Sequence, residues 1–188
     1  AVSKVMMGLA VALLIGNPLA TWLGQQLSWR YAFGLVSVLA IATVVMVAWT
    51  LPPDPDEPRA DPIRELRDFN RAPVWLTLTV GAIGFAGMFC VFSYLAPTMI
   101  HVTGVAEAWT PLGLLAFGVG GILGNLAGGW LFDRFGVRAA PVVLIWSALL
   151  LLVFPLAAQH LWSLLLAVIA VGTMGALGPV LQAYLMDI

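Results

Sequence analysis

Long stretches without a charged residue divide this chain. No Asp, Glu, Lys or Arg occurs in residues 5–29, 31–53, 72–106, 108–132 and 139–186. A helix needs about 20 mostly apolar residues to cross a bilayer, so each of the first four stretches holds one span. The fifth stretch is long enough for two spans, which Gln159 and His160 separate. The pattern therefore predicts six transmembrane helices, over about residues 3–25, 29–51, 73–100, 109–132, 139–158 and 161–186.

The six predicted helices are of two kinds. Two of them, residues 29–51 and 139–158, are apolar on every face, which is typical of a helix surrounded by lipid or protein. The other four carry most of the glycines, the mid-span prolines and the polar side chains. We expect these four to line an interior and the two uniformly apolar helices to face lipid.

Residues 52–72 form a long polar segment between the second and third predicted spans. The segment begins with prolines and acids, and Asp61-Pro62 then reads as a helix N-cap followed by proline at the first helical position. Apolar residues recur every third position from Ile63 to Phe69, with arginines among them. We predict a linker that ends in a short amphipathic helix on the membrane surface.

Composition supports an integral membrane protein. The chain is 62% hydrophobic and 9% charged, whereas soluble domains carry about 25% charged residues, and its mean hydropathy is +1.02. The net charge of −1 gives no reason to expect a nucleic-acid partner. The single cysteine, Cys90, rules out a disulfide framework, and no metal site or cofactor is predicted.

The basic residues predict the orientation of the chain. With six spans, Arg30 falls on one side of the membrane and every other Lys and Arg falls on the opposite side. Basic loops face the cytoplasm, so we expect the linker 52–72 and the loop 133–138 to be cytoplasmic. The residues on the basic side are Lys4, Arg59, Arg64, Arg67, Arg71, Arg134 and Arg138.

Apart from Lys4 and Arg30 near their ends, the predicted spans contain no Asp, Glu, Lys or Arg. An intramembrane ionisable residue is the default candidate for a proton relay, so a proton carrier, if there is one, lies outside these spans. The residues expected to line a substrate cavity are polar or bulky and lie in the four interior spans. They are Asn17, Phe92, Tyr94, Asn125, Met174 and Gln182, with Phe89 beside them.

This mixture suits a neutral or amphipathic solute such as a sugar or a drug, because a multiply charged solute needs a buried counter-charge. The alternative for the polar residues is hydrogen bonding between helices. The charged turn between the fourth and fifth spans also has two interpretations. It is either a topology anchor, or half of a latch in which Asp133 faces the N-terminus of a neighbouring helix, where unpaired N–H groups attract an anion.

Several motifs resemble the major facilitator superfamily. Residues 129–138 are similar to the family's cytoplasmic G-x-x-x-D-R-x-G-R-[RK] motif between helices eight and nine, with Val137 in place of one basic residue. The residues that match this gating motif are Gly129, Asp133, Arg134, Gly136 and Arg138. Residues 16–24 followed by 29–33 resemble the helix-five motif of drug:proton antiporters.

The helix-five motif rests on Gly16, Pro18 and Gly24, while Ala20 stands where the family often has a glycine. Three further stretches are similar to the sugar-efflux (arabinose-efflux) branch, namely residues 94–97, 120–125 and 182–187. The resemblance covers the whole chain, and the order and spacing of the motifs make it specific.

The resemblance implies an all-α integral membrane fold of twelve helices, of which this chain is a fragment covering helices five to ten. Residues 1–51 would be the last two helices of the N-terminal half, residues 52–72 the linker, and residues 73–188 the first four helices of the C-terminal half. The family places helices five, seven, eight and ten around a cavity. It also implies that Asp133 meets the start of helix five, near Ser3 and Lys4.

The expected function is secondary transport across the cell (inner) membrane by alternating access, as efflux of a small solute in exchange for protons. The expected partners are the substrate, the lipid bilayer, protons and the remaining helices, without which the fragment should be inactive. Two alternatives stay open. One is a non-transporting receptor or scaffold on the same fold. The other is a membrane enzyme, for which the chain has neither H-E-x-x-H nor an intramembrane Asp pair.

Overall fold

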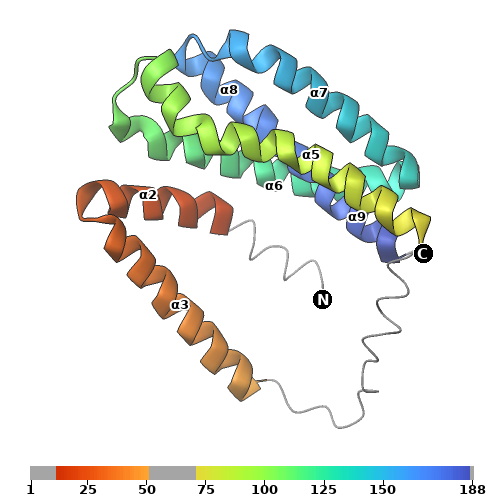
Figure 1. Ribbon diagram of the computed structural model, residues 1–188, viewed down its shortest axis with the longest axis horizontal. Coiled ribbons are helices and arrows are strands. Elements are labelled where there is room, and N and C mark those ends of the chain that lie inside the picture. The colour runs from red at the N-terminus through yellow and green to blue at the C-terminus, as the bar shows by residue number, and fades with distance from the viewer. Residues whose placement is uncertain (1–11, 51–70, 187–188) are drawn as a thin grey trace.

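The computed structural model describes residues 12–50 and 71–186, and every regular element in these ranges is helical. Helices α5 to α9 run back and forth beside one another, whereas α3 diverges from them (Figure 1). In chain order they are η1 (Ala12–Gly16), α2 (Asn17–Gln26), α3 (Trp29–Thr50), α5 (Ala72–Pro97), η2 (Thr98–Val102), η3 (Glu107–Trp109), α6 (Thr110–Phe135), η4 (Gly136–Arg138), α7 (Ala139–Ala157), α8 (Leu161–Gly172), η5 (Thr173–Ala176) and α9 (Leu177–Met186).

The expected all-α membrane fold is confirmed. Four segments of the described chain are long and apolar enough to cross a membrane: Trp29–Thr50, Ala72–Val102, Glu107–Ala157 and Leu161–Leu185. The third segment contains two helices, α6 and α7, which fold back on each other at η4 (Figure 1). The first predicted span is described from Ala12 onward, as η1 and α2, and the predicted amphipathic helix lies outside the described residues.

Gly136 makes the reversal between α6 and α7 possible. Its φ is +56° directly after the last residue of α6. An L-residue with a side chain rarely adopts a positive φ, whereas glycine does so at no steric cost. The glycine of the charged turn is therefore the residue that ends α6 and sends the chain back.

Two prolines adjoin wide helical turns. Pro18 follows the π-helical turns of η1, and Pro97 precedes those of η2. Because proline has no N–H, the carbonyl four residues earlier loses its usual partner, and the regular ladder is interrupted at these points. In both spans the departure from regular α-helix thus occurs beside a proline.

The sixth predicted span is not one continuous α-helix. A 3₁₀ segment, η5, separates α8 from α9 in the middle of the span. Gly172, Gly175 and Gly178 have weak helix propensity, and Pro179 leaves the carbonyl of Gly175 without its usual donor. The break is therefore built into the sequence of this span.

Close backbone packing holds α6 against the sixth span. A Cβ atom added at Gly124 would lie 2.7 Å from the carbonyl oxygen of Thr173, and Gly120 and Gly128 similarly face backbone atoms of Ile169 and Ala176. Small residues let two helix backbones approach this closely. In lipid, where the hydrophobic effect does not drive helices together, the van der Waals packing of such close contacts holds them together. The glycine row of α6 is the main seam of the bundle.

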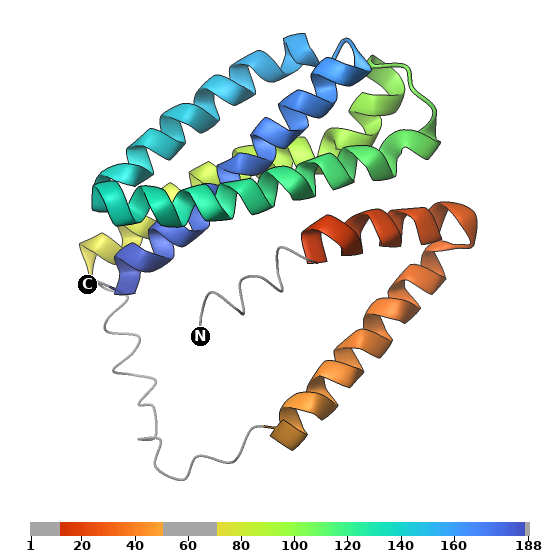
Figure 2. The same ribbon diagram turned by 180° about the vertical axis from the view of Figure 1, so that it is seen from behind.

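Helices α3 and α7 lie at the outside. No residue of α3 is buried, and α3 diverges from the bundle in both views (Figures 1 and 2). Helix α7 buries one narrow stripe, formed by Ala139, Val143 and Ser147. This arrangement agrees with the expectation that the two uniformly apolar helices face lipid.

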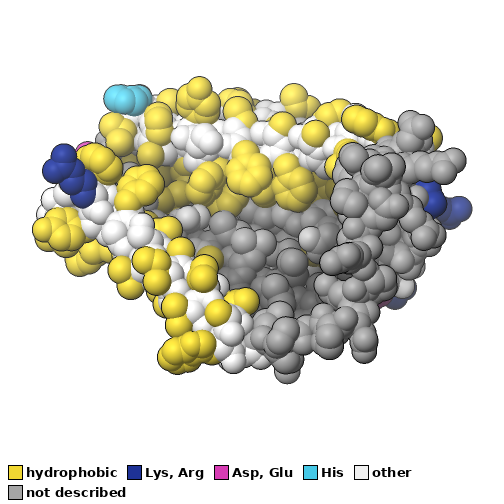
Figure 3. All heavy atoms as spheres, turned by 60° about the horizontal axis from the view of Figure 1, so that its bottom comes forward, with side chains coloured by type: hydrophobic (Ala, Val, Ile, Leu, Met, Phe, Trp, Pro, Cys, Tyr) yellow, Lys and Arg dark blue, Asp and Glu magenta, His cyan; other side chains and the backbone are white. Residues whose placement is uncertain are grey.

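The connecting turns gather at the two ends of the bundle. The Thr103 hydroxyl donates a hydrogen bond to the carbonyl of Ala158 at 2.7 Å, which joins two turns at one end. Figure 3 shows Lys and Arg side chains at the two ends of one face and hydrophobic side chains over the part between. This distribution matches a protein that spans a bilayer.

Candidate solute cavity

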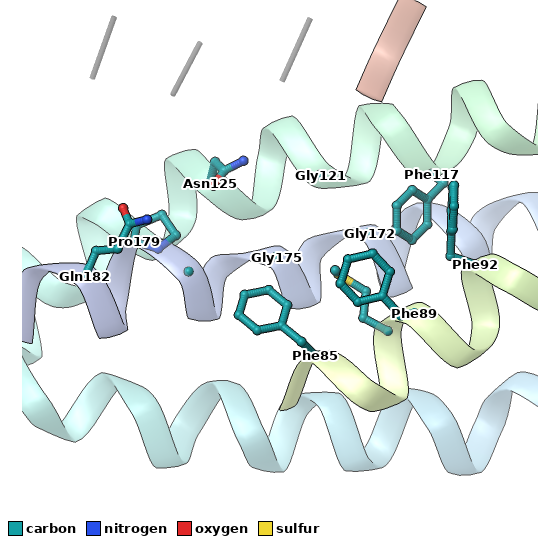
Figure 4. Close-up of a pocket in the computed structure, with 12 residues that line it drawn as sticks. Phe85, Phe89, Phe92, Phe117, Gly121, Asn125, Gly172, Gly175, Pro179 and Gln182 are labelled. Atoms are coloured by element: carbon teal, nitrogen blue, oxygen red, sulfur yellow. The ribbon is translucent and has the colours of Figure 1, made fainter. Parts of the chain in front are cut away.

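Helix α5, helix α6 and the broken sixth span surround a cavity of about 230 Å³ (Figure 4). It lies beside the 3₁₀ segment η5, at the break in the sixth span. The residues that line it are Phe85, Met88, Phe89, Phe92, Phe117, Gly121, Asn125, Gly172, Gly175, Gly178, Pro179 and Gln182.

Phenylalanine rings form one part of the wall. Phe85, Phe89 and Phe92 follow each other at helical spacing on α5, so they share one face. The rings of Phe92 and Phe117 have centroids 4.9 Å apart at an angle of 46°, and those of Phe85 and Phe89 are 6.4 Å apart at 41°. The rings thus form two pairs on the cavity wall, contributed by two helices.

Two carboxamides lie to the other side of the cavity. Figure 4 shows Asn125 of α6 and Gln182 of α9 there, away from the phenylalanine rings. Asn125 is half-buried and Gln182 is exposed, and neither makes a hydrogen bond within the described part of the chain. Each amide carries both donors and an acceptor, so both are available to a solute.

Glycine leaves space between these two parts. A Cβ atom added at Gly175 meets no atom within 4 Å, so this face of η5 is open to the cavity. A Cβ atom at Gly178 would lie 3.6 Å from Cζ of Phe85, an ordinary van der Waals contact. The floor of the cavity is therefore bare backbone rather than side chain.

The lining residues include no ionisable side chain. The described residues also contain no group of three His, Cys, Asp or Glu that could hold a metal ion. An isolated charge is costly to bury away from water unless it is paired. The cavity is therefore suited to uncharged solutes.

The structure brings together some of the expected lining residues and separates others. Phe92, Asn125 and Gln182 share the cavity. Asn17 is not among the lining residues. Tyr94 does not line the cavity and is 65% exposed. It stands two residues after Phe92, and residues two apart on a helix point to different faces.

Met174 does not line the cavity either. It is 2% exposed and belongs to the main hydrophobic core, and a Cβ atom at Gly87 would lie 3.6 Å from its Cε. The expectation grouped residues by type and depth in the membrane, and neither property says which way a side chain faces. Met88 of α5 lines the cavity instead.

Periodicity would have found the lining residues that the sequence interpretation missed. Phe85 stands four residues before Phe89, and Phe117, Gly121 and Asn125 repeat every four residues along α6. Side chains at this spacing lie on one helical face. Extending Phe89 by one turn reaches Phe85, and extending Asn125 by two turns along α6 reaches Phe117.

The gating-motif residues lie at the end of α6 and in η4. Asp133, Arg134 and Arg138 are exposed, and the Arg134 guanidinium lies 5.8 Å from the ring centroid of Trp130. A Cβ atom added at Gly129 meets nothing within 4 Å. The expected partners of Asp133, namely Ser3 and Lys4, lie outside the described residues, so the latch stays a prediction.

The helix-five motif lies beside α6. Elements η1 and α2 pack along α6, with Pro18 at the start of α2. Gly16 and Gly24 make no close backbone contact, since a Cβ atom at either one meets nothing within 4 Å. The tight glycine packing of α6 is therefore directed at the sixth span.

Comparisons with known proteins give the family. The family model described as Major Facilitator Superfamily matches residues 1–188. The chain is 36% identical to AraJ of Escherichia coli (strain K12) over its whole length, which covers 48% of AraJ. It is 32% identical to the inner membrane transport protein YdhP of the same strain over 71% of the chain and 34% of YdhP.

A third relative is the purine ribonucleoside efflux pump NepI of Escherichia coli (strain K12), 26% identical over 92% of the chain and 46% of NepI. No solved structure gives a significant match. The chain spans about half the length, or less, of the curated relatives it matches. With its apolar helical spans and a family match along its full length, this chain belongs to the major facilitator superfamily and is a multi-pass membrane protein.

Proposed function

We propose that the complete protein carrying this chain is a secondary active transporter that exports an uncharged or amphipathic solute across the cell (inner) membrane in exchange for protons. The cavity carries this proposal. Its aromatic wall, two free carboxamides and lack of ionisable lining residues suit a solute of that kind. The names of two relatives, an inner membrane transport protein and an efflux pump, support transport and its outward direction.

The six spans correspond to helices five to ten of the family's twelve. Residues 1–51 then end the N-terminal half, residues 52–72 link the halves on the cytoplasmic side, and residues 73–188 begin the C-terminal half. The cavity of about 230 Å³ is smaller than the roughly 300–1,000 Å³ of most ligand pockets. The N-terminal half supplies the rest of the wall, and the halves rock around the site in alternating access.

The proton carrier lies outside the spans of this chain. Coupling to protons needs a group that gains and loses a proton at membrane depth. Apart from Lys4 and Arg30 near their ends, these spans contain no Asp, Glu, Lys or Arg. The remaining helices therefore carry the proton, while this chain contributes solute contacts and the cytoplasmic gate at Asp133.

The direct test is transport by the purified complete protein in proteoliposomes. Accumulation of labelled neutral solutes should follow an imposed pH gradient and should collapse when an uncoupler is added. Vesicles containing residues 1–188 alone are the control and should accumulate nothing. A complete protein that binds solutes without moving any of them would instead be a receptor or scaffold.

A further inference from the structure

We infer that the solute is a flat heteroaromatic ring with an adjacent hydrogen-bond donor and acceptor on its edge, the pattern that an adenine base presents. This inference rests on the proposed function, because it takes the cavity between α5, α6 and α9 as the solute site. It adds the chemical class of the solute and the residues that select it. Three features of the cavity support it.

The first feature is the aromatic wall. Phe85, Phe89, Phe92 and Phe117 come from two helices, with ring centroids 4.9 and 6.4 Å apart within the two pairs. Phe89 is 54% exposed, so much of its ring is free to meet a solute. Aromatic side chains bind flat bases by stacking, because every base has a π-face.

The second feature is the pair of free carboxamides. Asn125 and Gln182 come from different helices and lie to the same side of the cavity (Figure 4). A carboxamide places an acceptor beside a donor, and this pairing matches the exocyclic amine and neighbouring ring nitrogen of adenine. Open backbone at Gly175 lies between the rings and the amides, which leaves room for a ring that reaches both.

The third feature is that the cavity lacks the groups that sugars, apolar drugs or cationic drugs would need for tight binding. A sugar carries hydroxyl groups around its whole ring, and Asn125 and Gln182 are the polar side chains among the lining residues. Unpaired hydroxyls are costly to remove from water, and a free sugar, unlike the ribose of a nucleoside, has no attached base whose stacking offsets that cost. A purely apolar drug leaves both amides unpaired, and a cationic drug finds no counter-charge among the lining residues.

The test is equilibrium binding to the purified complete protein, with adenosine as the probe. Purine riboside lacks the exocyclic amine and otherwise matches adenosine, while arabinose and tetraphenylphosphonium represent sugars and cationic drugs. Adenosine should bind at least tenfold more tightly than each comparator. Equal binding of adenosine and purine riboside, or preference for arabinose or the cation, overturns the inference without any variant protein.

Substitutions in the cavity test which residues bind adenosine. Asn125→Leu and Gln182→Leu should each weaken adenosine binding about tenfold and reduce the difference between adenosine and purine riboside. Gln159→Leu, an exposed glutamine in the turn before α8, is the matched control and should leave binding unchanged. Phe92→Leu should weaken both nucleosides alike, whereas Phe33→Leu on α3, 68% exposed, should not.

The binding and transport experiments can contradict the solute class and the transport function independently of each other. Amide-dependent adenosine binding without accumulation in proteoliposomes supports the solute class and contradicts the transport function. Accumulation of arabinose or the cation, with no adenosine binding, supports transport and contradicts the solute class. Adenosine binding that survives both amide substitutions contradicts the assigned residues.

Discussion

The side-chain Nε2 of Gln25 donates a hydrogen bond to the backbone carbonyl of Glu107 across 3.0 Å. Gln25 lies in the last turn of α2, and Glu107 begins η3, directly before α6. Among the described residues, this side-chain hydrogen bond joins the helices before residue 51 to those after residue 71. It therefore ties α2 to the start of α6 at one end of the contact between the two parts of the chain.

Gln25→Leu should weaken the contact between α2 and the start of α6. A net intramolecular hydrogen bond contributes about 0.5–1.5 kcal/mol, so its loss should shift the balance between closed and open forms roughly two- to tenfold toward open. Spin labels at Leu27 and Ala106 would report the shift as a longer distance distribution. Gln26→Leu, an exposed neighbour without a hydrogen bond in the described structure, is the control; an equal shift in both variants would show that the bond is irrelevant.

Gly124→Ala should destabilise the fold. The added methyl would lie 2.7 Å from the Thr173 carbonyl, and a backbone atom cannot move aside as a flexible side chain can. Overpacking of this kind costs about 1–3 kcal/mol, measurable by thermal unfolding in detergent. Gly129→Ala is the control, because its methyl meets nothing and alanine favours a helix by up to about 1 kcal/mol over glycine. Equal stability of the two variants would contradict the claim that the glycine row of α6 is tightly packed against the sixth span.

The approximate limits of the described spans could be predicted because lipid imposes one strong rule on the sequence. Charged residues interrupt the apolar runs at Arg30, Glu107 and Asp133, and the described helices end close to these places. The internal breaks were less visible. Thr173 sits in a 3₁₀ segment because glycines and Pro179 weaken the ladder around it, an effect that hydropathy does not measure.

The membership of the cavity could be predicted only in part. Asn125 and Gln182, which were singled out because polar groups at membrane depth are conspicuous, line the cavity. Tyr94 and Met174 do not line it, because the rotation of each helix is decided by packing, such as the contact of Gly124 with Thr173. Depth in the membrane follows from sequence position, whereas the facing direction depends on which glycine rows meet.

Trp146→Phe should weaken the contact between α7 and the break in the sixth span. The indole Nε1 of Trp146 donates to the Thr173 hydroxyl at 3.0 Å, and that hydroxyl donates to the carbonyl of Ala170 at 2.6 Å. Such hydrogen bonds in membranes are worth about 0.6 kcal/mol on average. A loss of about that size is expected on unfolding, with no loss for Trp162→Phe, whose 76% exposed side chain has no hydrogen bond in the described structure.

Asp133→Ala should reduce transport severalfold without reducing stability. Asp133 lies in the last turn of α6, where a negative charge is unfavourable by about 0.3–1 kcal/mol, so its removal should leave the fold unchanged or slightly more stable. Glu107→Gln at the opposite end is the matched control and should transport normally. Transport at the normal rate by the Asp133 variant, with normal membrane insertion, would argue against a gating role.

Thiol labelling at Gly175 would show whether the cavity beside η5 is the route of the solute. A cysteine fits there, because an added Cβ atom meets nothing within 4 Å, and Cys90 is first replaced by alanine. In the complete protein, Gly175→Cys should react with a membrane-impermeant maleimide added from either side in turn, and the reaction should stop transport. Gly34→Cys on α3, the helix expected to face lipid and equally free of neighbours at this position, should stay unlabelled. Labelling of Gly175→Cys no faster than that of Gly34→Cys, or normal transport after labelling, would contradict the account.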